Sequence, residues 1–356
     1  MMNTSRRNFL ATSAAFAVAG PSVAAESPLD ATRRWFKEAQ FGLMAHWGLY
    51  SLLAGEWKGR KSSRYGEWIQ SNFRIPNAEY HRLAAAFNPV FFDPLEWMKR
   101  ARDAGMRYFV FTAKHHEGFA MFRSKVSRFN VVDATPFGRD VVGEIAEACR
   151  ATGIKLGLYY SQDLDWSERD GGGYRHRRTA IAGSSWCNDW DWPDAAAKDY
   201  SRYFEAKAKP QVKEILTQYG DLCLVWFDTP QTISPAQSRE LADMVRRYNP
   251  GCLINSRIGN GLGDYTTPGD NELPSKSAGD KLFETPGTMN DSWGYKADDA
   301  NFKTVDRILA IKAHCRERGA NYLLNMSPDG LGRIPAGCLN IFEGLRLARE
   351  SAAAKS

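Results

Sequence analysis

A single carboxylate stands where one apolar segment of the chain ends. The run at 224–227 consists of Leu, Val, Trp and Phe, Asp228 follows it, and the chain then turns at Pro230. Such a run is typical of a strand buried on both faces. In a barrel of parallel strands the carboxyl ends form the active site, so Asp228 would lie where chemistry can take place. Asp is also a good helix-capping residue, and this segment alone favours neither role.

Similar side chains recur at the ends of the other strand-like runs. In chain order these ends carry His46 with Trp47, His115 with His116, Tyr159 with Tyr160, Trp226 with Asp228, Arg257, and Asn325. Aromatic rings stack on the apolar face of a pyranose, while imidazole, guanidinium and carboxylate groups hydrogen-bond its hydroxyls. A lone His or Trp beside a strand is usually a core residue. The recurrence at corresponding strand ends favours a sugar site instead.

The adjacent His115 and His116 invite a metal-site hypothesis, which the sequence disfavours. Neighbouring residues of a strand point to opposite faces, so both could bind one ion only if the strand had already ended. The chain has six histidines and no HExxH or CxxC pattern. We therefore expect neither a metal nor a cofactor. No G-x-S-x-G elbow indicates a serine hydrolase, and no glycine-rich loop after an early strand indicates a nucleotide site.

Strand-like and helix-like segments alternate along the chain and would position these residues. We expect strands at about 41–45, 108–112, 156–160, 224–228, 252–255 and 322–324. Helices are expected at about 93–105, 140–152, up to 219, 234–249, 304–318 and 336–350, with an irregular region between Arg257 and Thr304. Helix follows strand at least five times, which favours parallel strands joined by crossover helices. The length favours an eight-stranded (β/α) barrel over an open sheet.

The first 25 residues resemble an export signal. Arg6 and Arg7 precede an uncharged, Ala-rich segment that ends near Gly20, and small residues at 23–25 offer a cleavage site. The paired arginines indicate a twin-arginine signal, so we expect a periplasmic or otherwise exported protein that begins near Glu26. Because such proteins cross the membrane folded, the six scattered cysteines need no disulfides.

The composition is that of a soluble globular enzyme. Of the 356 residues, 43% are hydrophobic and 25% are charged. Beyond the signal no apolar run is long enough to span a membrane. The charges alternate without a basic block, which argues against nucleic acid as a partner. We expect residues 26–356 to form one catalytic domain.

Seven motifs, in order along the chain, carry a family resemblance. They are FG at 41–42 with HWG at 46–48, YGEW at 65–68, KHHEGF at 114–119, GLYYS at 157–161, WFD at 226–228, SWGY at 292–295 and LLNMSP at 323–328. From about Trp35 to Gly344 the chain resembles the family 29 glycoside hydrolases, the α-L-fucosidases. The resemblance implies an irregular (β/α)8-type, TIM-like barrel that removes terminal α-linked L-fucose with retention of configuration. The implied partner is a fucosylated oligosaccharide or glycoconjugate.

The resemblance also assigns roles to individual residues. Asp228 occupies the position of the nucleophile, and Trp293 that of an aromatic wall beside the methyl group of fucose. The residues that would line the fucose pocket are His46, Glu67, Trp68, His115, His116, Tyr159, Trp226 and Arg257. A retaining glycosidase needs one carboxylate that attacks the anomeric carbon and a second, about 5–5.5 Å away, that acts first as acid and then as base.

The second carboxylate departs from the family's pattern. Many relatives have Thr-Pro-Glu in the loop after the arginine strand, whereas this chain has Gly269 at the position of that acid. Our first choice for the acid is Glu284, which matches an acid found in many members. Glu272 is the second choice and Asp270 the third.

The end of the chain is another departure. Many members continue from the barrel into a β-sandwich, whereas this chain ends about thirty residues after Asn325. We therefore expect a single catalytic domain without that module. Two alternative functions remain: a related barrel glycosidase that acts on another sugar, and a fucose-binding protein with weak turnover.

Overall fold

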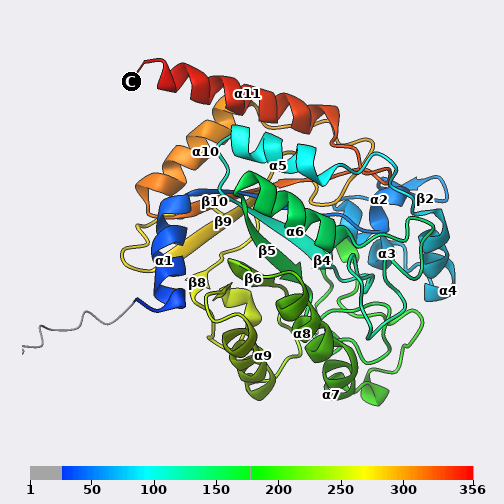
Figure 1. The fold of residues 1–356 in the computed structure, drawn as a ribbon. Coiled ribbons are helices and arrows are strands. Elements are labelled where there is room, and N and C mark those ends of the chain that lie inside the picture. The colour runs from blue at the N-terminus through cyan, green and yellow to red at the C-terminus, as the bar shows by residue number, and fades with distance from the viewer. Residues whose placement is uncertain (1–25, 177, 356) are drawn as a thin grey trace, which may run out of the picture.

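The computed structural model describes residues 26–176 and 178–355, and the signal predicted at 1–25 lies outside this part of the chain (Figure 1). Its centre is an eight-stranded parallel sheet in the order β7-β6-β5-β4-β1-β10-β9-β8. The strands are β1 (Phe41–Ala45), β4 (Tyr108–Lys114), β5 (Lys155–Tyr160), β6 (Leu224–Phe227), β7 (Leu253–Ile254), β8 (Tyr265–Thr266), β9 (Leu282–Thr288) and β10 (Asn321–Met326). A parallel bridge between Asn255 and Tyr265 joins the two edges, so the sheet forms a nearly closed barrel, as predicted.

Helices surround this sheet on its outer face (Figure 1). The longer ones are α1 (Pro28–Ala39), α5 (Pro94–Asp103), α6 (Val141–Thr152), α8 (Lys209–Gln218), α9 (Pro235–Tyr248), α10 (Val305–Glu317) and α11 (Ala336–Ala353). Local signals set their starts: the side chains of Asp93, Asp140, Ser234 and Thr304 each accept a backbone hydrogen bond as N-caps. The helices predicted from these signals are confirmed to within a few residues.

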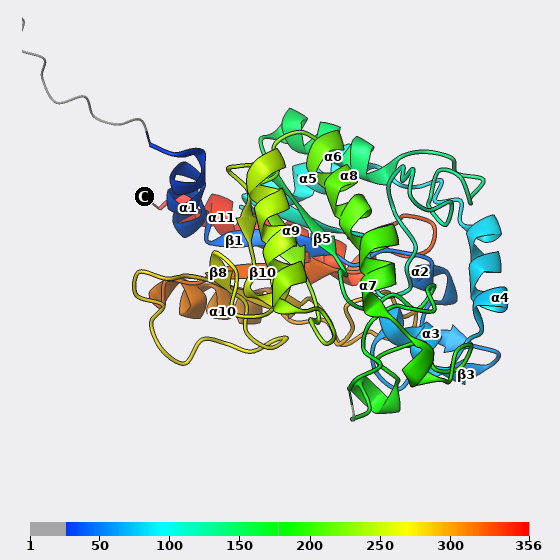
Figure 2. The same ribbon diagram turned by 90° about the horizontal axis from the view of Figure 1, so that it is seen from below.

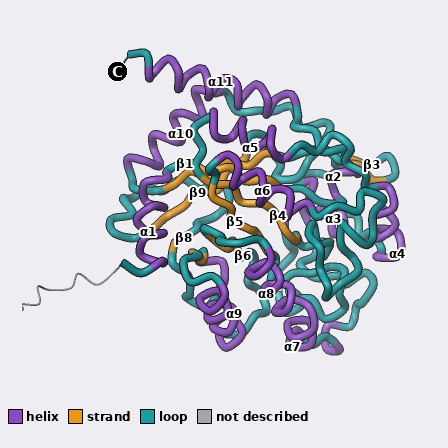
Figure 3. Tube along the Cα trace, viewed as in Figure 1, coloured by secondary structure: helices purple, strands orange, loops and turns teal. Residues whose placement is uncertain are grey.

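The two ends of the barrel differ. Long α1 lies at one end, whereas the short helices α2 (Tyr50–Leu53), α3 (Ile69–Asn72) and α4 (Asn77–Tyr80) gather at the opposite end, as Figures 1 and 2 both show. Most of the long loops lie on the side of α3 and α4 (Figure 3). Short α7 (Tyr200–Tyr203) follows one of these loops and leads through a π-helical turn (Phe204–Ala208) into α8, and the hairpin β2 (Glu56–Trp57) and β3 (Arg60–Lys61) follows α2.

Two strands were absent from the sequence prediction, which left 258–303 irregular. β8 has only two residues, and β9 contains Pro286 and Gly287, residue types that are depleted in strands. Both segments become strands by pairing with a neighbouring strand: β9 lies parallel to β10 along five residue pairs, and β8 pairs with β9. The second half of the barrel therefore depends on long-range contacts rather than on local propensity.

Side chains alternate between the barrel interior and the layer under the helices. Tyr108 and Val110 belong to the interior cluster, while Phe109 and Phe111 pack in the outer cluster. By the same alternation Trp226 and Asp228 face the same way, and the ladder pairs Trp226 with Tyr159 on β5. The interior layer therefore forms the floor beneath the residues at the strand ends. Within the described residues, no helix is long and apolar enough to cross a membrane.

Candidate active site

A cavity of about 430 Å³ opens at the carboxyl ends of the strands. The cavity is lined by residues of β1 and β6 and by residues of the loops that follow the strands, among them the loop after β4. The predicted site residues among its lining are His46, Glu67, Trp68, His115, His116, Trp226, Asp228, Arg257 and Trp293. Tyr159 lies just beneath, with its ring stacked between His115 and Trp226. The cavity therefore combines aromatic walls with polar groups, as a sugar site requires.

Asp228 is the carboxylate at the centre of this cavity. Its Oδ1 accepts a hydrogen bond from Arg257 at 2.9 Å, and its Oδ2 accepts one from the hydroxyl of Tyr159 at 2.8 Å. Burial alone would raise the pKa of Asp228, but the charge of Arg257 and the hydrogen bonds from Arg257 and Tyr159 outweigh burial and lower that pKa. Asp228 is therefore ionised at neutral pH, as a nucleophile must be.

Arg257 holds a second carboxylate beside the first. Its Nη2 donates to Oδ1 of Asp270 at 2.6 Å and to the backbone oxygen of Pro268 at 2.7 Å, while its Nη1 binds Asp228. The guanidinium also lies over the Trp226 ring, 4.7 Å from the centroid. One planar group thus spans two carboxylates that both line the cavity.

The histidines of the site are neutral hydrogen-bonding groups. Nδ1 of His46 lies 2.8 Å from the side-chain oxygen of Asn325, whose amide nitrogen donates to the backbone of Trp293. Asn325 therefore presents an acceptor, so the proton of His46 sits on Nδ1 and Nε2 keeps its lone pair. Burial lowers the pKa of His46 to about 4, so the ring is uncharged at neutral pH.

His116 is arranged in the same way. Its Nδ1 lies 2.7 Å from the hydroxyl oxygen of Ser161, which itself donates to the backbone oxygen of Leu164. The proton of His116 is therefore on Nδ1, and Nε2 lies 3.7 Å from Oδ2 of Asp228. Burial lowers the pKa of His116 to about 3, so no ion pair forms with Asp228 at neutral pH.

Glu67 adds a protonated carboxyl group to the wall. Its side chain accepts a hydrogen bond of 2.6 Å from the backbone N–H of Gly294, and the residue is only 2% exposed. Burial raises the pKa of Glu67 to about 8. At neutral pH the group therefore carries a proton that it can donate to a sugar hydroxyl.

Comparison with known proteins identifies the family. The model of the α-L-fucosidase family matches residues 14–345. This chain belongs to the α-L-fucosidase family. Two solved structures are similar: α-L-fucosidase AlfC from Lactobacillus casei, with 51% identity, a TM-score of 0.87 and coverage of 91% of this chain and 99% of that one, and the α-L-fucosidase from Vibrio sp. strain EJY3, with 34% identity, a TM-score of 0.84 and coverage of 90% and 55%. Both the predicted family and the predicted barrel are confirmed.

A more distant fucosidase extends well beyond the matched region. Rat tissue α-L-fucosidase is 29% identical over 327 residues, which span 85% of this chain and 64% of the rat protein. The chain therefore covers somewhat less than two thirds of that relative's length.

The positions of the three acid candidates in the structure do not follow their ranking from the sequence. Glu284, the first choice, is fully buried on β9, where it accepts hydrogen bonds from Tyr108 at 2.7 Å and from Nε1 of Trp226 at 2.9 Å. It lies beneath Trp226 and does not line the cavity. The strand register explains why Glu284 lies outside the cavity, because the third residue of β9 faces the barrel interior well before the strand ends.

The other two candidates lie in the loop after β8. Glu272 also lies outside the cavity lining, and its carboxylate accepts a hydrogen bond of 3.0 Å from the backbone N–H of Gly269. Asp270, the last choice, is the candidate that lines the cavity and shares Arg257 with Asp228. Its side chain is 33% exposed, so it stands at the rim.

Several residues that line the cavity were missing from the sequence prediction. Trp186, Ile181 and Tyr65 also line the cavity. The tryptophans at 186, 190 and 192 were a visible signal, but the segment lies in a long loop with no strand end to place it. Among the described residues, no group of three or more His, Cys, Asp or Glu side chains is placed to hold a metal ion.

Gln162, which the prediction also missed, fixes the backbone of the site. Its Oε1 accepts the backbone N–H of Asp228 at 2.9 Å, and its Nε2 donates to the backbone oxygen of Arg257 at 3.0 Å. Next to it, Oδ2 of Asp163 accepts three backbone N–H groups at 231–233, at 2.6 to 2.9 Å. The end of β5 therefore anchors the loops that carry both the nucleophile candidate and its arginine.

Proposed function

We propose that this protein is a retaining exo-α-L-fucosidase in which Asp228 is the nucleophile and Asp270 is the acid/base. The observation that carries this proposal is the pair of cavity-lining carboxylates bound to the two terminal nitrogens of Arg257. Family membership supports the choice of sugar and the retention of configuration, and the geometry of the cavity supports the choice of residues. The substrate is a terminal α-linked L-fucose on an oligosaccharide or glycoconjugate. A related structure, that of AlfC, contains Fucα(1,6)GlcNAc.

In the first step an oxygen of Asp228 forms a bond to the anomeric carbon while the bond from that carbon to the leaving-group oxygen breaks. Asp270 gives its proton to the departing oxygen. Oδ1 of Asp270 accepts from Arg257, so Oδ2 is the oxygen left to transfer the proton. The leaving saccharide must extend toward solvent, which favours partly exposed Asp270 over deeply buried Glu67 as the acid.

In the second step water attacks the anomeric carbon of the fucosyl-enzyme. Asp270, now ionised, takes one proton from the water, and the bond to Asp228 breaks to release α-L-fucose. Arg257 bridges both carboxylates throughout and offsets their mutual repulsion when both are charged.

The remaining lining groups recognise the sugar. Nε2 of His46 and Nε2 of His116 accept hydrogen bonds from hydroxyls, because both rings are neutral with the proton on Nδ1. Protonated Glu67 donates one. Trp293 and Trp186 provide apolar walls that fit the methyl group and the apolar face of fucose.

One experiment tests the activity. The purified protein is incubated with 4-nitrophenyl α-L-fucopyranoside and with the matching α-L-galactopyranoside, which differs only by a hydroxyl group at C6, and the product is followed by proton NMR. We expect hydrolysis of the fucoside and α-L-fucose as the first product. Faster hydrolysis of the galactoside would indicate the other-sugar glycosidase, and binding of fucose without turnover would indicate the binding protein.

We also propose that the protein is exported by the twin-arginine route to the periplasm or beyond. The support is the sequence of residues 1–25, with Arg6 and Arg7 ahead of an uncharged segment. A chain that folds before export is consistent with six buried cysteines, each a free thiol. An exported fucosidase would meet glycans outside the cytoplasm.

A further inference from the structure

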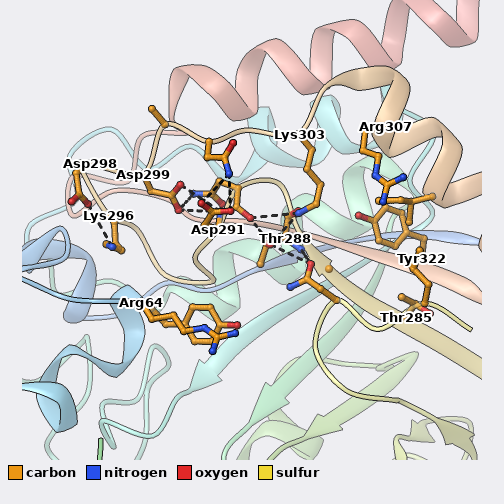
Figure 4. Close-up of a pocket in the computed structure, with 18 of the residues that line it drawn as sticks. Arg64, Thr285, Thr288, Asp291, Lys296, Asp298, Asp299, Lys303, Arg307 and Tyr322 are labelled. Carbon is orange, nitrogen blue, oxygen red and sulfur yellow. Dashed lines mark hydrogen bonds and ion pairs between the residues drawn. The ribbon is translucent and has the colours of Figure 1, made fainter. Parts of the chain in front are cut away.

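A second cavity of about 810 Å³ lies beside the active-site cavity. Its walls are β9, the start of β10, the loop after β9 and the first turns of α10 (Figure 4). The lining is polar and charged, unlike the aromatic wall of the fucose site. No step proposed above uses it.

The two cavities adjoin at Tyr65 and at the loop that carries Asp270. Tyr65 lines both of them. Asn271, the residue after Asp270, lines the second cavity, and its side-chain oxygen accepts the backbone N–H of Thr288 on β9 at 3.0 Å. A saccharide that leaves past Asp270 therefore moves toward the second cavity.

A glycine keeps the interior of the second cavity open. Gly287 lines it, and a Cβ at this position would lie 3.1 Å from the hydroxyl oxygen of Tyr322 and 3.3 Å from the side-chain oxygen of Asn271. The space between the acid/base loop and Tyr322 thus depends on the missing side chain.

One end of the second cavity is cationic. Arg307 lies there beside Tyr322, with Thr285 below, and the ammonium of Lys303 reaches Thr288 on the neighbouring part of the wall, as Figure 4 shows. Nζ of Lys303 already donates to the backbone oxygen and, at 3.3 Å, to Oγ1 of Thr288, and at 3.5 Å to the backbone oxygen of Asn290. Within the described residues the guanidinium of Arg307 has neither a carboxylate at ion-pair distance nor a hydrogen bond. Burial lowers the pKa of Lys303, with Asp291 opposing that shift and the charge of Arg307 adding to it. An anion at this end would relieve the repulsion between the two cations.

Two hydroxyl groups at the same end lack partners. The hydroxyl of Tyr322 and Oγ1 of Thr285 are buried without a hydrogen bond, and the two residues are 1% and 0% exposed. A buried polar group without a partner is costly, and a bound ligand can supply the missing partner.

The carboxylates of the second cavity lie at its other end and already have donors (Figure 4). Asp298 pairs with Lys61 and Lys296. Asp299 accepts the backbone N–H groups of Asp291 and Ser292. Asp291, the third carboxylate of the lining, accepts from the side-chain amide of Asn301. Because all three carboxylates already have donors, the unpaired guanidinium of Arg307 decides which ligand is preferred.

We propose that the second cavity binds the leaving-group saccharide and favours one that carries a carboxylate or sulfate group, held by Arg307 and the hydroxyl of Tyr322, with Lys303 adding positive charge nearby. This proposal rests on the fucosidase activity proposed above and specifies its substrate class. The guanidinium donates to the anionic oxygens, the tyrosine hydroxyl donates a further hydrogen bond, and the ammonium group contributes its charge.

The test compares substrates that reach the second cavity with one that does not. Each set contains three fucosylated oligosaccharides of the same linkage, whose leaving saccharide carries a carboxylate, a sulfate or neither. One set is assayed for each of the α1,2, α1,3 and α1,6 linkages, and 4-nitrophenyl α-L-fucopyranoside is assayed alongside them. For the fastest linkage we expect the acidic substrate to have a kcat/KM about tenfold above the neutral one, the effect of one charge-assisted hydrogen bond. The carboxylate and sulfate arms show which anion is preferred.

Variants then locate the effect. Arg307→Gln should remove the preference for the acidic substrate, and Tyr322→Phe should reduce it at least about threefold, the effect of one lost hydrogen bond. Both variants should leave kcat/KM on 4-nitrophenyl α-L-fucopyranoside unchanged. Arg316→Gln, on the same helix but outside both cavities, is the matched control and should change nothing.

Three results would overturn the second-cavity proposal: no acidic preference in the wild type, a preference that survives in Arg307→Gln, or hydrolysis of the aryl fucoside but of no oligosaccharide. A wild type that fails on the aryl fucoside itself would instead overturn the proposed function. The two failures are therefore distinguishable.

Discussion

The hydroxyl of Tyr159 donates a hydrogen bond of 2.8 Å to Oδ2 of Asp228. Arg257 occupies the other oxygen at 2.9 Å, so both oxygens of the carboxylate have a fixed donor. These two donors hold the plane of the carboxylate and keep it ionised despite its burial. A nucleophile that attacks one carbon from one face needs both properties.

The first prediction concerns Asp228 itself. Asp228→Gly should lower kcat on 4-nitrophenyl α-L-fucopyranoside by at least about 10³-fold, because no group remains to form the glycosyl-enzyme. Azide should restore turnover from the vacated face and give β-L-fucosyl azide, identified by NMR. Near-normal turnover of the variant without azide would contradict the mechanism.

The second prediction separates Asp270 from Glu284. Asp270→Ala should reduce kcat/KM far more for substrates with poor leaving groups than for activated aryl fucosides, since only the former need a proton on the departing oxygen. With azide it should give α-L-fucosyl azide, because azide then displaces Asp228 from the fucosyl-enzyme.

Glu284→Gln is the matched comparison. It should show no dependence on the leaving group, and should lower the free energy of unfolding by about 1–3 kcal/mol, because one of its two hydrogen-bond donors loses its acceptor. If Glu284→Gln or Glu67→Gln showed the leaving-group dependence and Asp270→Ala did not, the acid role would pass to that glutamate.

The third prediction concerns Gln162 as a positioning residue. Gln162→Leu should remove the hydrogen bonds to the backbone of Asp228 and Arg257 and lower kcat on the aryl fucoside by about 10- to 100-fold, because small displacements of catalytic groups are costly. Tyr160→Phe is the control: it loses the hydrogen bond from its hydroxyl to Gln211 on the outer side of the same strand. If Gln162→Leu and Tyr160→Phe had similar melting temperatures and equal kcat values, this result would argue against a positioning role for Gln162.

The fourth prediction concerns pH. Glu67 has its pKa raised to about 8, so above that pH it loses the proton that binds the sugar. We expect kcat/KM on the aryl fucoside to fall as the pH rises through about 8, and Glu67→Gln to flatten this alkaline limb. If the alkaline limb of the pH profile were unchanged in Glu67→Gln, the limb would belong to the titration of another group.

The same shift affects stability. The folded protein holds the Glu67 proton more tightly than the unfolded chain does, whose pKa is near 4.5. This contribution is therefore complete below pH 4.5 and is lost as the pH rises toward 8. Denaturant unfolding at pH 5 and pH 8 should show a smaller loss of unfolding free energy in Glu67→Gln than in the wild type.

The fifth prediction concerns export. Changing both Arg6 and Arg7 to Lys should leave the protein in the cytoplasm, folded and active, because the twin-arginine pair is what the export machinery reads. Cell fractionation and fucosidase assays of each fraction measure this. Normal export of the double variant would show that another signal directs the protein.

Local sequence determined the elements that begin the barrel. Asp93 before Pro94, and Ser234 before Pro235, mark helix starts through interactions within one turn, and the apolar runs at 41–45 and 224–227 are strands because both faces are buried. The position of Asp228 at a strand end follows from the same local pattern. Motif order then identified the family and most of the pocket.

Only the tertiary structure shows which of the candidate carboxylates lines the cavity. Glu284 matches a family acid in sequence, but β9 pairs with β10 in a register that points this side chain under Trp226. Asp270 reaches the cavity because Arg257 binds it and Asn271 ties its loop to β9. Sequence records residue types and local periodicity, whereas the direction of a side chain in a weakly patterned strand or loop is set by partners distant in the chain.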